Sequence, residues 1–341
     1  MAVVPAVFLR NPRYAILLVI AVLATVLVLS STRSGVDDGG YLRQPLSSST
    51  GSGKHSQAEW VKEAVREEEE RYQMMLKDRE AMVRRYGPTP DRVQAFPAGM
   101  LYTLWDFYLP AFQCPHRVER IGTMGDGGKW VCGFERVAKQ SECTVYSFGI
   151  NGESSFEAAL MTRNPACQVW GYDFSVSAFG PEVDSVPSLQ TRAHFFPYAL
   201  GPRDAPSESP PMHTLKSLMH QNGHKWIDVL KIDIEGAEFG SLVRFIDDFT
   251  TTDPITGSNT TTLPVGQMQL EIHAREWSGY GDFEHYNAWW EKLERAGLRP
   301  FWTEANLVYI NIFKSGVRPD LVEYSFLNIK GDHALVSDNY I

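Results

Sequence analysis

Charged side chains gather at the end of one short apolar segment near the middle of the chain. The sequence DVLKIDIEGAEF, residues 228–239, predicts a buried strand with Asp233, Glu235 and Glu238 at or beyond its end. Charges beside a buried strand are costly unless they are paired or face a ligand. Asp233 and Glu235 could accept a proton or bind a divalent cation. The structural alternative is that Glu235 and Glu238 only cap the next helix and pair with Lys231 or an arginine.

A further acid and a histidine lie in the segment QMQLEIHARE. Glu271 and His273 are two residues apart, so in a strand their side chains point to the same face. Histidine has an ordinary pKa close to neutral, which makes His273 the better general base of the two. These side chains and Asp233 could remove the proton of a hydroxyl group during a transfer reaction. We therefore predict Asp233, Glu271 and His273 as catalytic residues.

Three loops could hold a cofactor that contains a nucleoside. In YSFGINGESSFE, Gly149 allows a tight turn, and the amides at the start of the next helix suit a carboxylate or a phosphate. Asp173 follows Gly149 at about the distance where nucleoside-binding folds place an acceptor for the ribose hydroxyls. Asp173 could instead cap a helix. Ala199, in the apolar turn PYALG, could line an adenine pocket.

Strands and helices alternate from about residue 95 onward. The predicted strands are 144–148, 168–173, 194–199, 228–234, 268–272, 298–304 and 322–329. The predicted helices between them are 155–162, 214–221, 237–247 and 286–296. This alternation is typical of a parallel α/β sheet with helices on both faces. Ligands of such sheets bind at the carboxyl ends of the strands, so we expect the side chains named above to share one crevice.

Several segments resemble a known family. Residues 214–239, TLKSLMHQNGHKWIDVLKIDIEGAEF, resemble the signature of FkbM-type methyltransferases. Further segments are similar to the methyltransferase-like protein 24 group, whose members are predicted methyltransferases of the secretory pathway. These segments are GDGGKWVC (125–132), CTVYSFGINGESSFE (143–157), QLEIH (269–273) and EYSFLN (323–328). The resemblance covers roughly residues 112–330. It implies a class I methyltransferase fold, with a doubly wound, mostly parallel, seven-stranded Rossmann-like sheet that binds S-adenosylmethionine.

The resemblance also implies roles for single residues. The methionine part of the cofactor would lie beside Phe148, Gly149 and Asn151. Asp173 would hold the ribose hydroxyls, and Asp233 would lie where the methyl group is delivered. Ser147 departs from the pattern, because that position is commonly acidic, and the loop lacks a full GxGxG.

The implied sheet order also suggests how the four cysteines pair. The first two strands would be parallel neighbours, with Cys143 and Cys167 at their amino ends. A Cys143–Cys167 disulfide is therefore geometrically reasonable. It leaves Cys114 to pair with Cys132.

The N-terminal part predicts a membrane anchor. Residues 14–29, YAILLVIAVLATVLVL, carry no charge and follow Arg10 and Arg13. They predict a signal-anchor helix at 14–30, with a short cytoplasmic tail before it and a lumenal domain after it. The alternative is a cleaved signal peptide and a secreted protein. Both place the rest of the chain in the secretory pathway, in agreement with the glycosylation sequon at Asn259.

The rest of the chain divides into three predicted parts. Residues 31–56 are rich in Ser and Gly and predict a flexible linker. Residues 57–94 are highly charged and rich in helix formers, which predicts a helical stem. The methyltransferase domain is predicted at 95–341.

Charge and motif together favour one function and leave two alternatives. A net charge of -9 argues against a nucleic-acid partner. We expect O-methylation of a hydroxyl on a glycan or a small metabolite. A lumenal type II glycosyltransferase is one alternative, with Asp233-Ile234-Glu235 as a DxD-like metal site. The other is a binding module without catalytic activity.

Overall fold

The computed structural model describes residues 60–307, 309 and 318–340. The predicted cytoplasmic tail, signal anchor and linker lie outside the described residues. Within the part that is described, no helix is both long and apolar enough to cross a membrane. Residues 55–341 form one compact unit.

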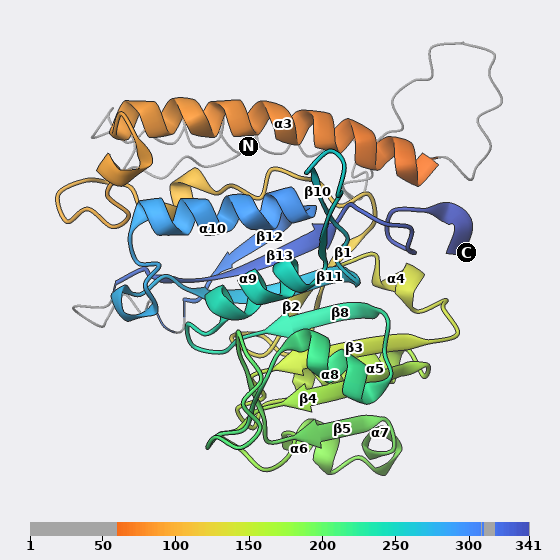
Figure 1. Ribbon diagram of the computed structural model, residues 1–341. Coiled ribbons are helices and arrows are strands. Elements are labelled where there is room, and N and C mark those ends of the chain that lie inside the picture. The colour runs from red at the N-terminus through yellow and green to blue at the C-terminus, as the bar shows by residue number, and fades with distance from the viewer. Residues whose placement is uncertain (1–59, 308, 310–317, 341) are drawn as a thin grey trace, which may run out of the picture. The chain divides into compact units, whose positions relative to one another are not determined.

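A central sheet of seven strands organises this unit, in the order β12-β13-β11-β8-β3-β4-β5 (Figure 1). The strands are β3 (Cys143–Phe148), β4 (Cys167–Tyr172), β5 (Ala193–Phe196), β8 (Ile227–Ile232), β11 (Val265–His273), β12 (Leu298–Ala305) and β13 (Leu321–Asn328). The neighbouring strands from β11 to β5 all pair in parallel. β13 is antiparallel to both β11 and β12. The predicted mostly parallel sheet is confirmed, and β13 makes it a mixed one.

The helices lie on both faces of the sheet, as a doubly wound fold requires (Figure 1). They are α3 (Trp60–Tyr86), α4 (Phe134–Val137), α5 (Ser155–Arg163), α6 (Pro181–Asp184), α7 (Pro187–Gln190), α8 (Leu215–Asn222), α9 (Glu238–Asp248) and α10 (Phe283–Ala296). Tyr146 of β3 belongs to the core cluster that contains α8, α9 and α10, whereas Val145 belongs to the cluster that contains α5. Alternate residues of one buried strand therefore serve two separate cores.

Short elements complete the unit. Three small strand pairs are β1 (Val118–Ile121) with β2 (Lys129–Cys132), β6 (Ala199–Leu200) with β7 (Met212–His213), and β9 (Thr250–Thr252) with β10 (Asn259–Thr261). Four 3-10 turns are η2 (Pro90–Arg92), η3 (Leu104–Phe107), η4 (Glu276–Ser278) and η5 (Asp338–Tyr340). β5 ends one residue before Pro197, earlier than the sequence pattern predicts, because proline has no amide to donate to the ladder.

Local sequence signals set the ends of two helices near the site. Thr214 caps α8 by accepting a hydrogen bond from the amide of Ser217, and Gly223 follows the helix with φ of 74°. Asp282 caps α10 in the same manner through the amide of His285. Such caps satisfy amides that have no partner inside the helix. The predicted helix 214–221 agrees closely with α8, whereas α10 begins at Phe283, directly after its cap and before the predicted start at 286.

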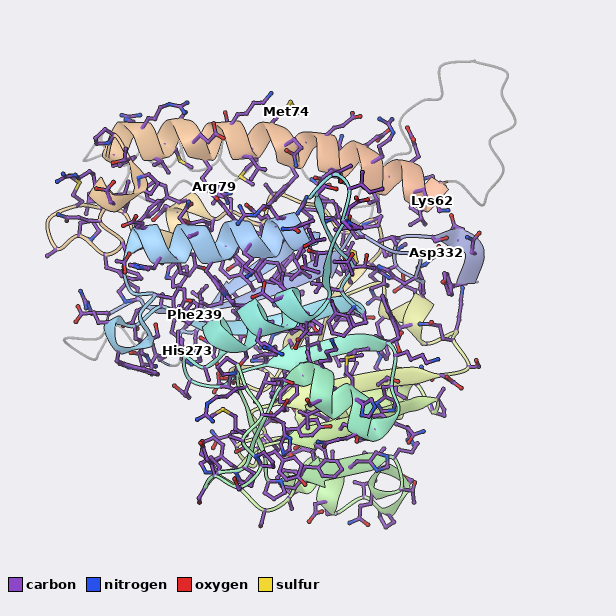
Figure 2. All side chains as sticks on the ribbon, in the orientation of Figure 1. Lys62, Met74, Arg79, Phe239, His273 and Asp332 are labelled. Carbon is purple, nitrogen blue, oxygen red and sulfur yellow. A yellow bond between two sulfur atoms is a disulfide. The ribbon has the colours of Figure 1, made fainter. Side chains whose placement is uncertain are left out.

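The predicted stem is helical, but it packs against the rest of the unit. Tyr72 and Arg79 of α3 are buried, and both donate hydrogen bonds to Glu294 of α10. Figure 2 shows Arg79 on the side of α3 that faces α10, and Met74 on the other side. Met74 is exposed. Helix α3 is therefore part of the folded unit and not a separate spacer.

Both predicted disulfides are confirmed. Cys143 and Cys167 are bonded, with their Cα atoms 4.2 Å apart, and they are register partners at the start of β3 and β4. Cys114 is bonded to Cys132 at the end of β2.

Candidate active site

One cavity opens at the carboxyl ends of the parallel strands. Its volume is about 710 Å³, within the usual range for small-molecule sites. All the residues predicted for the cofactor and for catalysis line it: Phe148, Gly149, Asn151, Asp173, Ala199, Asp233, Glu235, Glu271 and His273. The fold therefore brings the predicted side chains together, while the role of each one stays a prediction.

The turn after β3 depends on a glycine. Gly149 has φ of +83°, and a Cβ atom there would lie 1.8 Å from the carbonyl oxygen of Asp233. A side chain at this position would collide with the end of β8. The carbonyl oxygen of Gly149 accepts a hydrogen bond of 2.6 Å from Nζ of Lys231, which is buried. This hydrogen bond from Lys231 of β8 thus stabilises the turn.

A buried acid lies beside this lysine. Glu157 of α5 is 3.6 Å from Nζ of Lys231 and accepts a hydrogen bond from the hydroxyl group of Ser147. Glu157 is fully buried. A carboxylate is therefore present next to Ser147, where the family resemblance leads us to expect one on the strand itself. No sequence pattern signals this acid, because Glu157 lies in a helix that also has a polar face.

Asp173 organises the cofactor side of the cavity. Its Oδ2 accepts the amides of Ile150 and Asn151 at 2.9 and 2.8 Å. Its Oδ1 accepts the amide and the hydroxyl group of Ser175 at 2.7 and 2.6 Å. Burial alone would raise the pKa of Asp173, but these hydrogen bonds outweigh it and lower the pKa below the ordinary value. The Ser175 hydroxyl is the partner that a ribose hydroxyl could replace.

We expect Asp173→Ala to weaken S-adenosylmethionine binding by about 10- to 100-fold, because hydrogen bonds to a charged group contribute about 1.5–3 kcal/mol each. The turnover number at saturating cofactor should change much less. Calorimetric titration with S-adenosylmethionine measures the first effect. Asp184→Ala, at an exposed acid of α6, is the matched control. A dissociation constant equal to that of the wild type would show that Asp173 only caps the loop.

The part of the cavity predicted to be catalytic contains a histidine between three carboxylates. His273 is 1% exposed, and its Nε2 lies 3.3 Å from Glu235 and 4.0 Å from Asp233. Its Nδ1 lies 3.2 Å from Oε1 of Glu238, which also accepts the backbone amide of His273. Burial opposes a charge on the ring, but the hydrogen bond to Glu238 and the three carboxylates outweigh it and raise the pKa of His273. With a raised pKa, this ring stays protonated to a higher pH than an ordinary histidine does.

Glu238 has a definite role in this arrangement. Its side chain is fully buried, and Oε2 accepts the amide of Gly236 at 2.7 Å. It therefore ties the turn after β8 to the end of β11. Pairing with Lys231, one of the structural alternatives, does not occur, because Lys231 contacts Glu157 instead.

Glu271 lines the same cavity, with its side chain close enough to Asp233 for the two to form a hydrogen bond. Burial, followed by the charges of Asp233 and Glu323, raises the pKa of Glu271 to about 10, although the charge of Lys129 opposes the shift. A carboxyl group with this pKa is protonated near neutral pH and donates a hydrogen bond. The side-chain amide of Asn306 donates to Glu271 at 2.9 Å. Glu271 is therefore better suited to hold an acceptor than to remove its proton.

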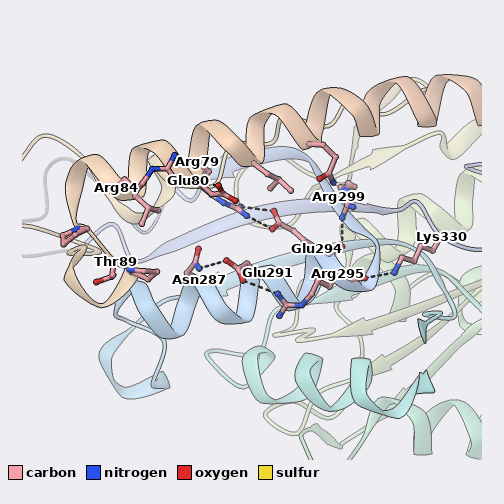
Figure 3. Close-up of a pocket in the computed structure, with 15 residues that line it drawn as sticks. Arg79, Glu80, Arg84, Thr89, Asn287, Glu291, Glu294, Arg295, Arg299 and Lys330 are labelled. Atoms are coloured by element: carbon pink, nitrogen blue, oxygen red, sulfur yellow. Dashed lines mark hydrogen bonds and ion pairs between the residues drawn. The ribbon is translucent and has the colours of Figure 1, made fainter. Parts of the chain in front are cut away.

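A second cavity, of about 620 Å³, lies between α3 and α10 (Figure 3). Its charged side chains are paired within the protein. The pairs are Arg79 with Glu294, Arg299 with Glu69, Arg295 with Glu291, and Arg84 with Glu80. Lys330 donates to the carbonyl oxygen of Arg295. This cavity is a groove along the α3 interface, in which the arginines are paired with acids and Lys330 is held by a carbonyl oxygen.

Comparison with known proteins identifies a family for this chain. The family model Methyltransf_22, described as a methyltransferase domain, matches residues 68–314. The probable methyltransferase-like protein 24 of Rattus norvegicus is 27% identical over 196 residues. That match covers 53% of this chain and 48% of the relative, so the chain spans about half the length of the relative. The comparisons do not show the FkbM type.

Solved structures resemble the chain only distantly. An rRNA methylase from Streptococcus thermophilus has a TM-score of 0.33 at 10% identity, covering 58% of this chain and 94% of its own. The Methanococcus jannaschii fibrillarin pre-rRNA processing protein has a TM-score of 0.30 at 13% identity, covering 69% and 87%. Because these TM-scores are low, the Rossmann-like class is inferred from the order and direction of the strands alone. On the match to the family model, the chain belongs to the methyltransferase domain family Methyltransf_22, close to the methyltransferase-like protein 24 group.

Proposed function

We propose that this methyltransferase transfers a methyl group from S-adenosylmethionine to a hydroxyl group of a glycan or a small metabolite. The observation that carries the proposal is the single cavity in which the predicted cofactor residues and the predicted catalytic residues meet. The family match supports the methyltransferase part and leaves the glycosyltransferase alternative without support. Use of S-adenosylmethionine is implied by the class.

The residues of the cavity fit this cofactor. The Gly149 turn and the Asp173 loop provide a closely approachable backbone and a carboxylate, and Ala199 and Leu200 provide an apolar wall. When bound, S-adenosylmethionine supplies an electrophilic methyl group on a sulfonium. During methyl transfer, the bond between the sulfur and the methyl carbon would break as the bond between the acceptor oxygen and that carbon forms. A base would accept the hydroxyl proton. We assign this base to Asp233, because the surroundings of Glu271 and His273 raise the pKa of both.

The charge of the catalytic side limits the class of acceptor. The acids Asp126, Asp233 and Glu235 line it, and Arg275 pairs with Glu235 at 3.0 Å. A carboxylate or a sulfate on the acceptor would be repelled. The hydroxyl group of Tyr309 donates to Asp320, and its oxygen can accept a hydrogen bond from an uncharged polyol. The proposed acceptor is therefore a neutral hydroxyl compound.

Calorimetric titration of the purified full chain tests the function. We expect S-adenosylmethionine to bind with one site per chain and a uridine nucleotide sugar not to bind. Binding of the nucleotide sugar alone would overturn the proposal, and binding of neither would favour the module without catalytic activity. Transfer of a labelled methyl group to neutral glycans and to hydroxylated metabolites then identifies the acceptor.

We also propose that the domain lies in the lumen of the secretory pathway, either anchored as a type II membrane protein or secreted after cleavage. Both disulfides support this compartment, because such bonds form under oxidising conditions. Asn259 of the sequon is exposed on β10. An endoglycosidase should increase the mobility of the full chain and not that of Asn259→Gln. Complete digestion of the domain by protease added outside intact microsomes would contradict a lumenal position.

A further inference from the structure

We propose that His273, Asp233 and Glu235 form a binding site for a divalent transition-metal cation at the acceptor end of the cavity, with Glu238 orienting the histidine. The inference deepens the proposed function and rests on it, because the cation would lie where the acceptor hydroxyl must lie. The sequence suggests the carboxylates of Asp233 and Glu235 as ligands, and His273 completes the set.

The ligand atoms are close enough to share one ion. One atom from each of the three side chains lies within 4.8 Å of the others. A cation at about 2.0–2.2 Å from each atom fits between them after small side-chain movements. Glu235 is 70% exposed at its side chain, so its carboxylate can turn from Arg275 toward the ion. Glu235 has φ of +52°, a strained backbone of the kind that clusters at functional sites.

The independent observation is the environment of His273. Its side chain is buried, and Nε2 lies near the carboxylates of Asp233 and Glu235. Glu238 takes the other ring nitrogen, so in the neutral ring the Nδ1 proton would be directed to Glu238 and the Nε2 lone pair toward the two carboxylates, and a bound cation would take the place of the Nε2 proton. A carboxylate behind a histidine in this manner is the usual second layer of a metal site. Oε1 and Oε2 of Glu238 also hold two backbone amides, which fixes the whole arrangement.

A second group of acids in the same cavity is less suitable. Asp126, Glu271 and Glu323 also have carboxylate oxygens within 4.8 Å of one another. However, Lys129 forms an ion pair with Glu323, and the amide of Asn306 donates to both Asp126 and Glu271 at 2.9 Å. The charge and the hydrogen bonds of this group are already supplied by the protein.

The donor set indicates the class of ion and its use. Imidazole favours ions such as Zn²⁺, and carboxylates favour Mn²⁺ and Mg²⁺. A mixed set of one imidazole and two carboxylates favours Mn²⁺ or Zn²⁺ over Mg²⁺ and Ca²⁺. Such an ion would lower the pKa of a bound hydroxyl group, and the oxygen of Asp233 that does not bind the ion could accept the proton.

The test uses Co²⁺ as a spectroscopic probe and Mn²⁺ in calorimetry, each added to the full chain after treatment with a chelator. We expect one ion per chain and a visible Co²⁺ band that shows a nitrogen ligand. His273→Ala should abolish the band, and Glu238→Gln should weaken binding by about 10- to 100-fold. Glu235→Gln should also weaken binding, and its exposed position keeps the fold intact. Asp126→Asn is the matched control in the same cavity and should bind as the wild type.

Metal binding that survives His273→Ala, or that is lost in Asp126→Asn, would overturn the site. Absence of binding to the wild-type chain would overturn it too. Calorimetry with S-adenosylmethionine in the absence of metal shows separately whether the proposed function stands. The two results can therefore fail independently.

Discussion

Asp233→Asn should lower the turnover number by about 10²- to 10⁴-fold, the usual contribution of a group that accepts a proton in the reaction. Asparagine keeps the shape of the side chain but removes its charge, so neither proton acceptance nor binding of a cation survives. The backbone at this position should be unaffected, because its amide still donates to the carbonyl oxygen of Phe148 at 3.0 Å. Steady-state kinetics with labelled S-adenosylmethionine measures the effect.

Two comparisons separate this loss of catalysis from a loss of binding or of folding. The dissociation constant for S-adenosylmethionine should stay within about threefold of the wild type, which is less than about 1 kcal/mol. Asp173→Ala should show the reverse pattern of weak binding and nearly normal turnover. Asp184→Asn, at an exposed acid of α6, should be normal in both. Wild-type turnover in Asp233→Asn would show that this carboxylate is structural.

The sheet could be predicted because its strands are buried and parallel. Every residue of β8 and β11 is buried. β8 is largely apolar in sequence, and β11 alternates apolar residues with Gln, Glu and His, so both have a recognisable strand pattern between helices. The caps of α8 and α10 add local signals that do not depend on the rest of the chain. Residues placed after such strands meet at one edge of the sheet, which is why the predicted site residues share a cavity.

The neighbours of Glu271 in the site could not be predicted in the same way. Glu323 opposes Glu271 because β13 is antiparallel to β11, and Lys129 comes from the β1–β2 hairpin far away in the sequence. No local periodicity contains such a pairing. Burial raises the pKa of Glu271, and the charges of Asp233 and Glu323 raise it further, whereas Lys129 opposes the shift. Residue types and spacing alone do not contain these effects.

The charged helix α3 has a misleading pattern for a related reason. Its composition is that of a solvated helix, and the sequence analysis therefore predicts a stem. The packing depends on a few side chains with distant partners, among them Tyr72 and Arg79 with Glu294. Arg299 reaches back to Glu69 of the helix with two hydrogen bonds of 2.6 and 2.7 Å. Charge counts along a helix do not reveal such contacts.

Glu294→Ala should lower the free energy of unfolding by about 3–5 kcal/mol, the usual cost of removing one partner from a buried ion pair. Glu294 is buried and accepts hydrogen bonds from Tyr72, from both terminal nitrogens of Arg79, and from Trp290. Alanine would leave the guanidinium of Arg79 buried without a counter-charge. Because α3 closes over α10 at this point, the loss should also release the helix. Urea unfolding followed by tryptophan fluorescence measures the change.

Glu291→Ala on the same helix is the matched control. Glu291 pairs with Arg295 at 3.2 Å, but its side chain is 44% exposed, so its removal should cost less than about 1 kcal/mol. Replacing Arg79 and Glu294 together by methionine should restore part of the stability, since no buried charge then stays unpaired. A loss in Glu294→Ala no larger than in Glu291→Ala would mean that water reaches the groove and solvates Arg79. In that case α3 would be held by its apolar contacts alone, and the stem interpretation of this helix would regain its basis.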